Sequence, residues 1–171
     1  MKTKVLFMLI AGVFSTLFMS SCLDTDDDRD INTAAIEKVK LKTYLDSLVA
    51  KGHDIDTTEM GIYYVRIEDG DGDFAQPGDT LTVGYAGYFI DGTIFDSSEI
   101  NSEDGKMEFV LENPPFIAGW DDVMKVMNEG AKVQAMIPSE FAYGSEGYGV
   151  VPPYETLVFV IELFDIKPSQ E

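Results

Sequence analysis

The sequence predicts an α+β fold, in which a curved antiparallel sheet wraps around one short helix and a further helix precedes the sheet. Three observations point to this class. From residue 61 onward, runs of alternating apolar residues are separated by Gly, Asp and Pro, which is typical of antiparallel strands. Residues 120–127 instead repeat their apolar side chains at helical spacing. Hydrophobic residues make up 45% of the 171 residues, enough for the core of one ordinary domain.

Residues 33–52 are predicted to form the preceding helix. Apolar side chains recur there at helical spacing: Ile36, Leu41, Tyr44, Leu45 and Leu48. Asn32 or Thr33 can cap the start of this helix, and Gly52 can end it. The apolar stripe predicts docking onto the domain that follows, and a dimer seam is the alternative.

The elements of that domain follow in chain order, over residues 60–168. The predicted strands are 61–68, 79–90, 107–111, 131–138 and 155–166. An acidic turn at 69–73 separates the first two strands. Alternation places one set of side chains on the same face of the second strand: Leu81, Val83, Tyr85, Gly87 and Phe89. Alternation likewise places one set of side chains on the same face of the last strand: Leu157, Phe159, Ile161 and Leu163. Helical spacing places Trp120, Val123, Met124 and Met127 on one face of the short helix, and Gly130 can end it.

The first residues are predicted to lie outside the domain, as a lipoprotein signal peptide over 1–21. Lys2 and Lys4 precede an apolar run at 5–19, which is shorter than a membrane span of about 20 residues. The segment MSSC that ends at Cys22 resembles a bacterial lipobox, in which the cysteine is lipidated. An ordinary cleavage site that happens to contain a cysteine is the alternative.

Residues 22–32 are predicted to be an acidic tether behind that lipid anchor. Like charges in LDTDDDRD (23–30) repel one another and keep the segment extended. Several acyl chains on Cys22 would hold the protein at a membrane. We therefore expect a lipid-anchored protein of the cell envelope, at the outer membrane. The acidic residues also resemble surface-export signals, which leaves a surface-exposed position open.

Composition argues against several kinds of chemistry. The chain carries 12 Lys and Arg against 31 Asp and Glu, a formal net charge of −19, so nucleic acid is not expected as a partner. Cys22 and His53 are the only residues of their types, which disfavours thiolate, histidine-cluster and Ser-His-Asp sites. The acidic turn at 69–73 is not a calcium loop, because Phe74 stands where glycine is needed. We expect neither a metal nor another cofactor.

Four segments together resemble one family, the FKBP-type peptidyl-prolyl isomerases, which also bind rapamycin-like macrolides. The segments are VGYAGYFIDGTIFDSS (83–98), MEFVL (107–111), FIAGWDDVM (116–124) and EFAYGSEGYGVVPPYETLVFVIEL (140–163). This resemblance implies an FKBP-like antiparallel sheet of five or six strands around the short helix. It also implies isomerase activity on X–Pro bonds, without covalent or metal catalysis.

The resemblance also implies roles for individual residues. Trp120 would form the floor of an aromatic pocket, with walls from Tyr85, Phe95, Phe109 and Phe159. Ile117 would donate its backbone N–H to a substrate carbonyl, and the Tyr143 hydroxyl would reach the prolyl amide. Asp96 would accept a hydrogen bond at the pocket edge. Val150 and Val151 would line a flap, and Phe116 and Tyr148 would lie at the rim.

Three residues depart from the family pattern. Phe116 replaces a smaller aliphatic residue, Tyr148 stands where many members have histidine, and Glu99 replaces a basic residue after Asp-Ser-Ser. The first two lie at the expected rim and leave the peptide preference and the macrolide affinity open. An FKBP-like module that binds proline segments or partner proteins with little turnover, or acts as a chaperone, is therefore the alternative to an isomerase of exported or envelope proteins.

Overall fold

The computed structural model describes residues 32–169. The predicted signal peptide, Cys22 and nearly all of the acidic tether lie outside these residues. In chain order the elements are α1 (Ala34–Ala50), β1 (Asp56–Thr57), β2 (Tyr63–Glu68), β3 (Asp71–Phe74), β4 (Thr80–Phe89), β5 (Ile94–Ser97), α2 (Ser98–Asn101), β6 (Met107–Val110), α3 (Ala118–Met124), β7 (Asn128–Glu129), β8 (Lys132–Ile137), the 3-10 helix η1 (Ser139–Phe141) and β9 (Leu157–Lys167).

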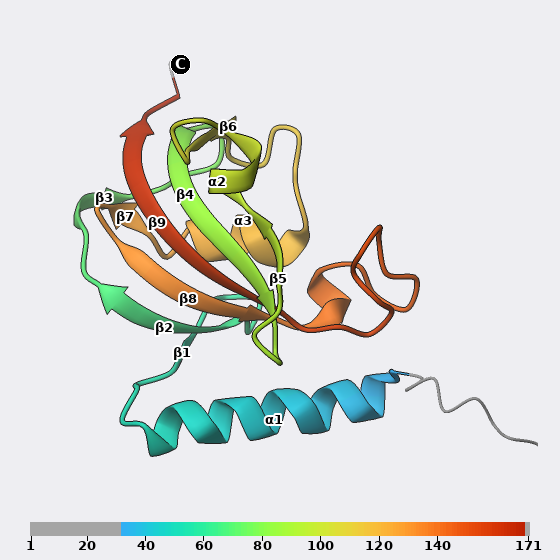
Figure 1. Cartoon of the computed structure of the whole chain (residues 1–171). Coiled ribbons are helices and arrows are strands. Elements are labelled where there is room, and N and C mark those ends of the chain that lie inside the picture. Colours follow the sequence, from blue (N-terminus) through green and yellow to red (C-terminus); the bar gives the residue numbers. More distant parts are fainter. Residues whose placement is uncertain (1–31, 170–171) are drawn as a thin grey trace, which may run out of the picture. The chain divides into compact units, whose positions relative to one another are not determined.

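Within residues 32–169, seven strands form one antiparallel sheet in the order β1-β2-β8-β9-β4-β5, and β6 also pairs with β4. The sheet curves around α3 (Figure 1). The predicted fold class is therefore confirmed. The sheet has more than the expected five or six strands, because the two-residue strand β1 extends the edge beyond β2. A separate ribbon joins β3 to β7.

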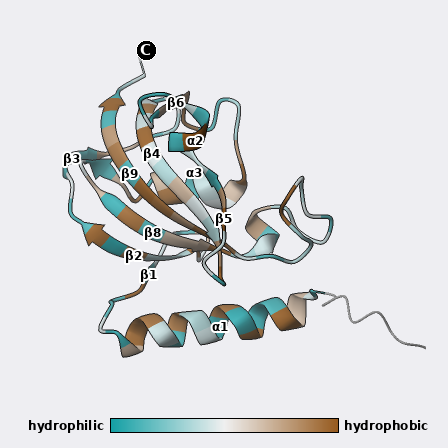
Figure 2. Ribbon diagram, in the orientation of Figure 1, coloured by the Kyte–Doolittle hydropathy of each residue, from teal (hydrophilic) through white to brown (hydrophobic). Residues whose placement is uncertain are grey.

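The main core lies between the concave face of the sheet and α3. The predicted alternation holds in β4 and β9, where Leu81, Val83, Leu157, Ile161 and Leu163 have no exposed surface. Hydrophobic residues run along β9 in Figure 2. The short helix covers 118–124 instead of 120–127, since the chain continues past Met124 as hydrogen-bonded turns. Met127 is nevertheless fully buried in this core.

Helix α1 packs on the other side of the sheet. Thr33 caps it by accepting a hydrogen bond from the Ile36 N–H, and Gly52 follows its end at φ +88°. Leu41 and Leu48 are buried against Val65, Met136 and Val158 of the sheet. The stripe thus docks on the domain, as one of the two predicted alternatives requires. Ile36 does not belong to this cluster, and 45% of its surface is therefore exposed.

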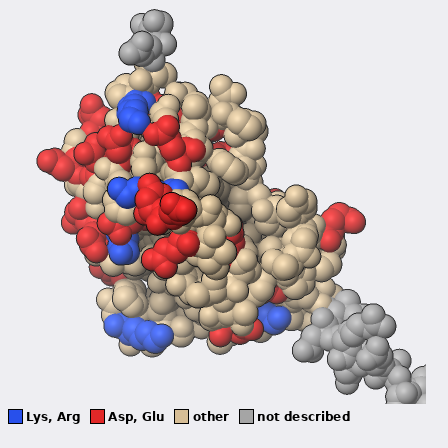
Figure 3. Space-filling model, turned by 45° about the horizontal axis from the view of Figure 1, so that its top comes forward, with Lys and Arg blue, Asp and Glu red and all other residues tan. Residues whose placement is uncertain are grey.

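The surface of the described residues is predominantly acidic. Asp and Glu cover more of the face in Figure 3 than Lys and Arg do. Among residues 32–169, no helix combines the length and the apolar character that a membrane crossing needs. The same residues contain no cluster of three or more His, Cys, Asp or Glu side chains arranged to hold a metal ion.

Candidate active site

Aromatic rings from five elements and the preceding loop of α3 meet around Trp120. Trp120 lies in the first turn of α3 and is only 4% exposed. Its ring meets Tyr85 and Phe159 edge-on, with centroids at 5.4 and 5.2 Å. Phe109 and Phe116 lie at 6.2 and 6.3 Å. These are the distances at which aromatic pairs attract one another. We call Tyr85, Phe95, Phe109, Phe116, Trp120 and Phe159 the aromatic basin.

Gly87 permits the tight contact between Phe95 and Phe159 in this basin. It pairs with Phe159 across the β4–β9 ladder. A Cβ atom at Gly87 would lie 2.7 Å from Phe95 Cζ and 2.8 Å from Phe159 Cε1. Because glycine has no such atom, the two rings meet edge-on at 5.5 Å. The absence of a side chain at this one position therefore determines how closely two walls of the basin approach.

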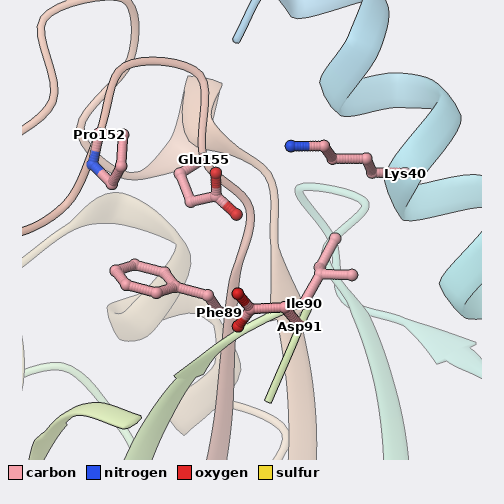
Figure 4. Close-up of a pocket in the computed structure, with 6 residues that line it drawn as sticks. All are labelled: Lys40, Phe89, Ile90, Asp91, Pro152 and Glu155. Atoms are coloured by element: carbon pink, nitrogen blue, oxygen red, sulfur yellow. The ribbon is translucent and has the colours of Figure 1, made fainter. Parts of the chain in front are cut away.

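Phe89 extends the basin on the side of Phe95. The two rings stack with centroids 5.0 Å apart. Phe89 also lines a neighbouring pocket of about 360 Å³ between α1, the end of β4 and the loop before β9 (Figure 4). The alternation predicts that Phe89 shares a face of the strand with Tyr85 and Gly87, but it does not predict this link to the basin.

A hydrogen-bond network joins the basin to Asp96. The Tyr85 hydroxyl donates to Asp96 Oδ2 at 2.9 Å. Asn101 Nδ2 donates to Asp96 Oδ1 at 2.8 Å and to the Tyr85 hydroxyl at 3.2 Å. Burial, followed by the hydrogen bond to Asp96, raises the pKa of Tyr85 to about 12. The phenol is protonated at neutral pH, like that of an ordinary tyrosine, and donates to Asp96.

Asn101 has no counterpart among the predicted site residues. It ends the four-residue helix α2, whose start is capped by Ser97. The sequence showed only that a basic residue was missing after Asp-Ser-Ser. The sequence holds only a weak signal for this contact, a polar residue five positions after Asp96, because Asp96 lies in β5 and the helix that carries Asn101 begins at Ser98.

Tyr143 and Tyr148 stack on each other at the mouth of the site. Their centroids lie 5.3 Å apart and their planes differ by 17°. Tyr143 is half-buried, whereas 72% of Tyr148 is exposed. Burial raises the pKa of the Tyr143 phenol above its ordinary value, and the Tyr148 and Asp96 groups raise it further. Tyr143 packs against the core cluster that contains Trp120 and Phe159.

The loop that leads into α3 presents Phe116 and Ile117. Half of Phe116 is exposed, and its N–H donates to Asp121 Oδ2 at 3.1 Å. Ile117 precedes α3 in extended conformation, and no residue among 32–169 accepts a hydrogen bond from its backbone N–H. Burial raises the pKa of the Asp121 carboxyl.

Polar groups without partners gather at the same place. Within residues 32–169, the buried side-chain polar atoms that lack a hydrogen bond are Trp120 Nε1 and Asp121 Oδ1. Leaving such a buried atom without a partner costs free energy in a folded protein. Both belong to the first turn of α3, which supplies Trp120 to the basin.

The two valines expected to line the flap lie differently. Val151 is 6% exposed and packs against the main core, whereas Val150 is 72% exposed. A tight turn from Tyr148 to Val151 explains this difference. The backbones of its two end residues exchange hydrogen bonds at 2.9 and 2.8 Å, and Val150 lies at the tip of the turn. The structure thus gathers most of the predicted site residues around Trp120 and leaves Val150 pointing to solvent.

Comparison with known proteins shows the family to which the chain is similar. Residues 72–164 match the family described as FKBP-type peptidyl-prolyl cis-trans isomerase. FkpA of Escherichia coli strain K12, an FKBP-type peptidyl-prolyl cis-trans isomerase, is 38% identical over 136 residues, which are 80% of this chain and 48% of that protein. The chain therefore spans about half the length of this relative.

Two further comparisons cover the domain more fully. Peptidyl-prolyl cis-trans isomerase Fkbp12 of Drosophila melanogaster is 36% identical over 63% of this chain and 100% of its own length. The crystal structure of FkpA from Escherichia coli matches with a TM-score of 0.69 and 36% identity, over 80% of this chain and 62% of that one. The predicted resemblance is confirmed, and the chain belongs to the family of FKBP-type peptidyl-prolyl cis-trans isomerases.

Proposed function

We propose that this protein is a peptidyl-prolyl cis–trans isomerase that acts on X–Pro bonds of exported or envelope polypeptides. The observation that carries the proposal is the aromatic basin, closed below by Trp120 and edged by the Tyr85–Asp96–Asn101 network. A proline ring is apolar and compact, and it suits a basin of this kind. The substrate carbonyls that flank the proline can accept hydrogen bonds from donors at the edge of the basin.

The physics of amide rotation explains how such a basin accelerates the reaction. Resonance gives rotation about the peptide bond a barrier of about 18–20 kcal/mol. The twisted transition state has lost that resonance and is less dipolar than the planar amide. A water-poor aromatic site therefore disfavours the planar ground state more than the twisted state. No covalent bond and no proton transfer are needed.

Two donors would orient the substrate over the rings. The Tyr143 hydroxyl would reach the prolyl amide, and the Ile117 N–H would bind a flanking carbonyl. The phenols of Tyr85 and Tyr143 are protonated near pH 7, as an ordinary tyrosine is, and their raised pKa values extend that state to higher pH. Holding the bond in one orientation removes part of the entropic cost of reaching the transition state.

The proposal is tested with an Ala-Pro peptide whose cis–trans exchange is followed by NMR. The wild type should make exchange much faster than the uncatalysed process, which takes about tens to hundreds of seconds. Tyr143→Phe should slow the catalysed exchange. Phe74→Leu, an aromatic change at an exposed position of β3, should not. Folded wild type without any acceleration would refute the proposal.

A binding module is the second candidate, and the exposed rim favours it. Phe116, Tyr148 and Val150 offer 50%, 72% and 72% of their surfaces to solvent, which suits contact with apolar segments of unfolded chains or macrolide rings. Trp120 is the only tryptophan, so its fluorescence reports occupation of the basin. Peptide binding without accelerated exchange would favour this candidate over the enzyme.

We also propose that lipidated Cys22 anchors the protein in the cell envelope, at the outer membrane. Support comes from the position of the only cysteine directly after the signal-like segment 1–21. Membrane fractionation checks this: the wild type should sediment with membranes, and Cys22→Ser should not. Wild type recovered entirely in the soluble fraction would overturn it.

A further inference from the structure

The segment that carries Tyr143 and Tyr148 is held at both ends by helix α1. We call this segment, residues 142–156 between η1 and β9, the flap. Most of its length makes no strand or helix. The orientation of Tyr143 therefore depends on how the ends of the flap are fixed.

Glu37 contacts both ends at once. It lies in α1 and is only 7% exposed. The Ser139 N–H donates to Glu37 Oε1 and the Ser139 hydroxyl to Oε2, each at 2.6 Å. The Thr156 hydroxyl donates to Oε1 at 2.8 Å. Ser139 precedes the flap and Thr156 is its last residue, so one carboxylate joins its two ends.

This arrangement is more specific than the packing of α1 requires. Apolar contacts of Leu41 and Leu48 already dock the helix on the sheet. A buried carboxylate is costly unless hydrogen bonds satisfy it, and no Lys, Arg or His among residues 32–169 forms an ion pair with Glu37. Its three donors come from Ser139, just before the flap, and from Thr156, the last flap residue, which indicates that the contact serves the flap.

The hydrogen bonds continue from these ends to the residue after Tyr143. The Ser139 carbonyl accepts from the Gly144 N–H at 2.8 Å. The Gly144 carbonyl accepts from the Tyr154 N–H, also at 2.8 Å. Gly144 is thus hydrogen-bonded to Ser139 before the flap and to Tyr154 in its returning limb, and it is the direct neighbour of Tyr143 in the chain.

The start of α1 holds the returning limb of the flap as well. Asn32 Nδ2 lies 2.6 Å from the Tyr154 carbonyl and 2.9 Å from Glu155 Oε2. Lys40 extends from the next turns of α1 toward Glu155 across the neighbouring pocket (Figure 4). Asn32, just before α1, and Glu37 within it therefore both contact the flap, and Glu37 is the buried one of the two.

We infer that Glu37 is a positioning residue for the active site, which acts through Ser139 and Gly144 to hold Tyr143 against the basin. This inference rests on the proposed isomerase function. Helix α1 then contributes to the catalytic activity, although it precedes the matched family region at 72–164.

The test compares three variants of the full chain under conditions where each is folded. Glu37→Ala removes the acceptor of all three hydrogen bonds and should lower kcat/KM on the order of tenfold. Glu37→Gln keeps the shape and an acceptor oxygen, and its NH₂ can donate to the Ser139 hydroxyl, so it should restore most of the activity. Asp46→Ala removes an exposed carboxylate from the same helix and should change nothing.

Two further measurements separate positioning from loss of stability. Peptide affinity, read from Trp120 fluorescence, should change little in Glu37→Ala, because the basin itself is untouched. Hydrogen exchange should become faster at flap amides such as Gly144 and Tyr154 and stay unchanged in β4 and β9. A Glu37→Ala protein with wild-type kcat/KM, or with unchanged exchange in the flap, would overturn the inference.

The outcomes also distinguish this inference from the proposed function. If the wild type does not catalyse isomerisation, the proposed function fails, while hydrogen exchange still shows whether Glu37 holds the flap. If Glu37→Ala does not fold, Thr156→Val takes its place, since it removes one donor and nearly keeps the side-chain shape. Unchanged activity and unchanged flap exchange in Thr156→Val would then overturn the inference.

Discussion

Gly87→Ala should damage the aromatic basin through a single added carbon. That atom would lie 2.7 Å from Phe95 Cζ, whereas ordinary van der Waals contact begins at 3.4 Å. The Phe95 ring must then retreat by the difference, about 0.7 Å. Phe159 must move as well, since its Cε1 would lie at 2.8 Å. Overpacking of this kind costs about 1–3 kcal/mol of folding free energy.

The displacement should affect catalysis more than stability alone would. A misplacement of about 1 Å at reacting groups can cost on the order of 100-fold in rate. For the smaller shift of two basin walls, we expect kcat/KM to fall by about tenfold. The assay is NMR exchange of the Ala-Pro peptide, with thermal unfolding measured on the same preparations.

Gly84→Ala is the matched control for this prediction. It adds the same atom to the same strand, where it would lie 2.9 Å from Phe164 Cε2, away from the basin. It should lower the unfolding temperature as well and leave kcat/KM near the wild-type value. If Gly87→Ala loses stability but keeps its activity, as Gly84→Ala should, the reasoning about the basin walls is refuted.

Two other predictions follow from the edge of the basin. Asn101→Ala removes two donors from the Tyr85–Asp96 pair and should lower kcat/KM severalfold; an unchanged value in the peptide assay would show that Asp96 needs no such support. Burial and the Asp96 hydrogen bond raise the pKa of Tyr85 to about 12, so its contribution to stability is full below pH 10 and is lost as pH rises toward 12. Chemical denaturation across this range should show a smaller alkaline loss for Tyr85→Phe than for wild type, and identical slopes would contradict the assignment.

Local patterns in the sequence predict the elements because each pattern reflects a local physical cause. The alternation in β4 and β9 reflects one buried face, and the stripe of α1 reflects docking on the sheet. The length of α3 is harder to predict. Met127 is buried in the core beyond the end of the helix, and burial alone does not distinguish a helix from hydrogen-bonded turns.

The site shows where sequence reasoning reaches its limit. The family resemblance points to the rings around Trp120. Glu37 looks like a solvent-facing residue on a helix, because its partners Ser139 and Thr156 are more than 100 positions away. Asn101 likewise belongs to no motif, and Val150 looks equivalent to Val151 until a turn separates them. Such contacts depend on tertiary structure, which the spacing of residues along the chain does not contain.

The central position of β9 has a consequence for how the protein folds. This last described strand lies between β8 and β4, and it joins β4 over ten paired positions, from Thr80–Lys167 to Phe89–Leu157. Strands so far apart in sequence lose chain entropy when they come together, before their pairing contributes favourable contacts. Folding is therefore slow compared with that of helical proteins. Because β9 also supplies Phe159, no stretch of the chain that stops short of it can assemble the basin. Catalytic competence and completion of the sheet should therefore be acquired in the same kinetic step.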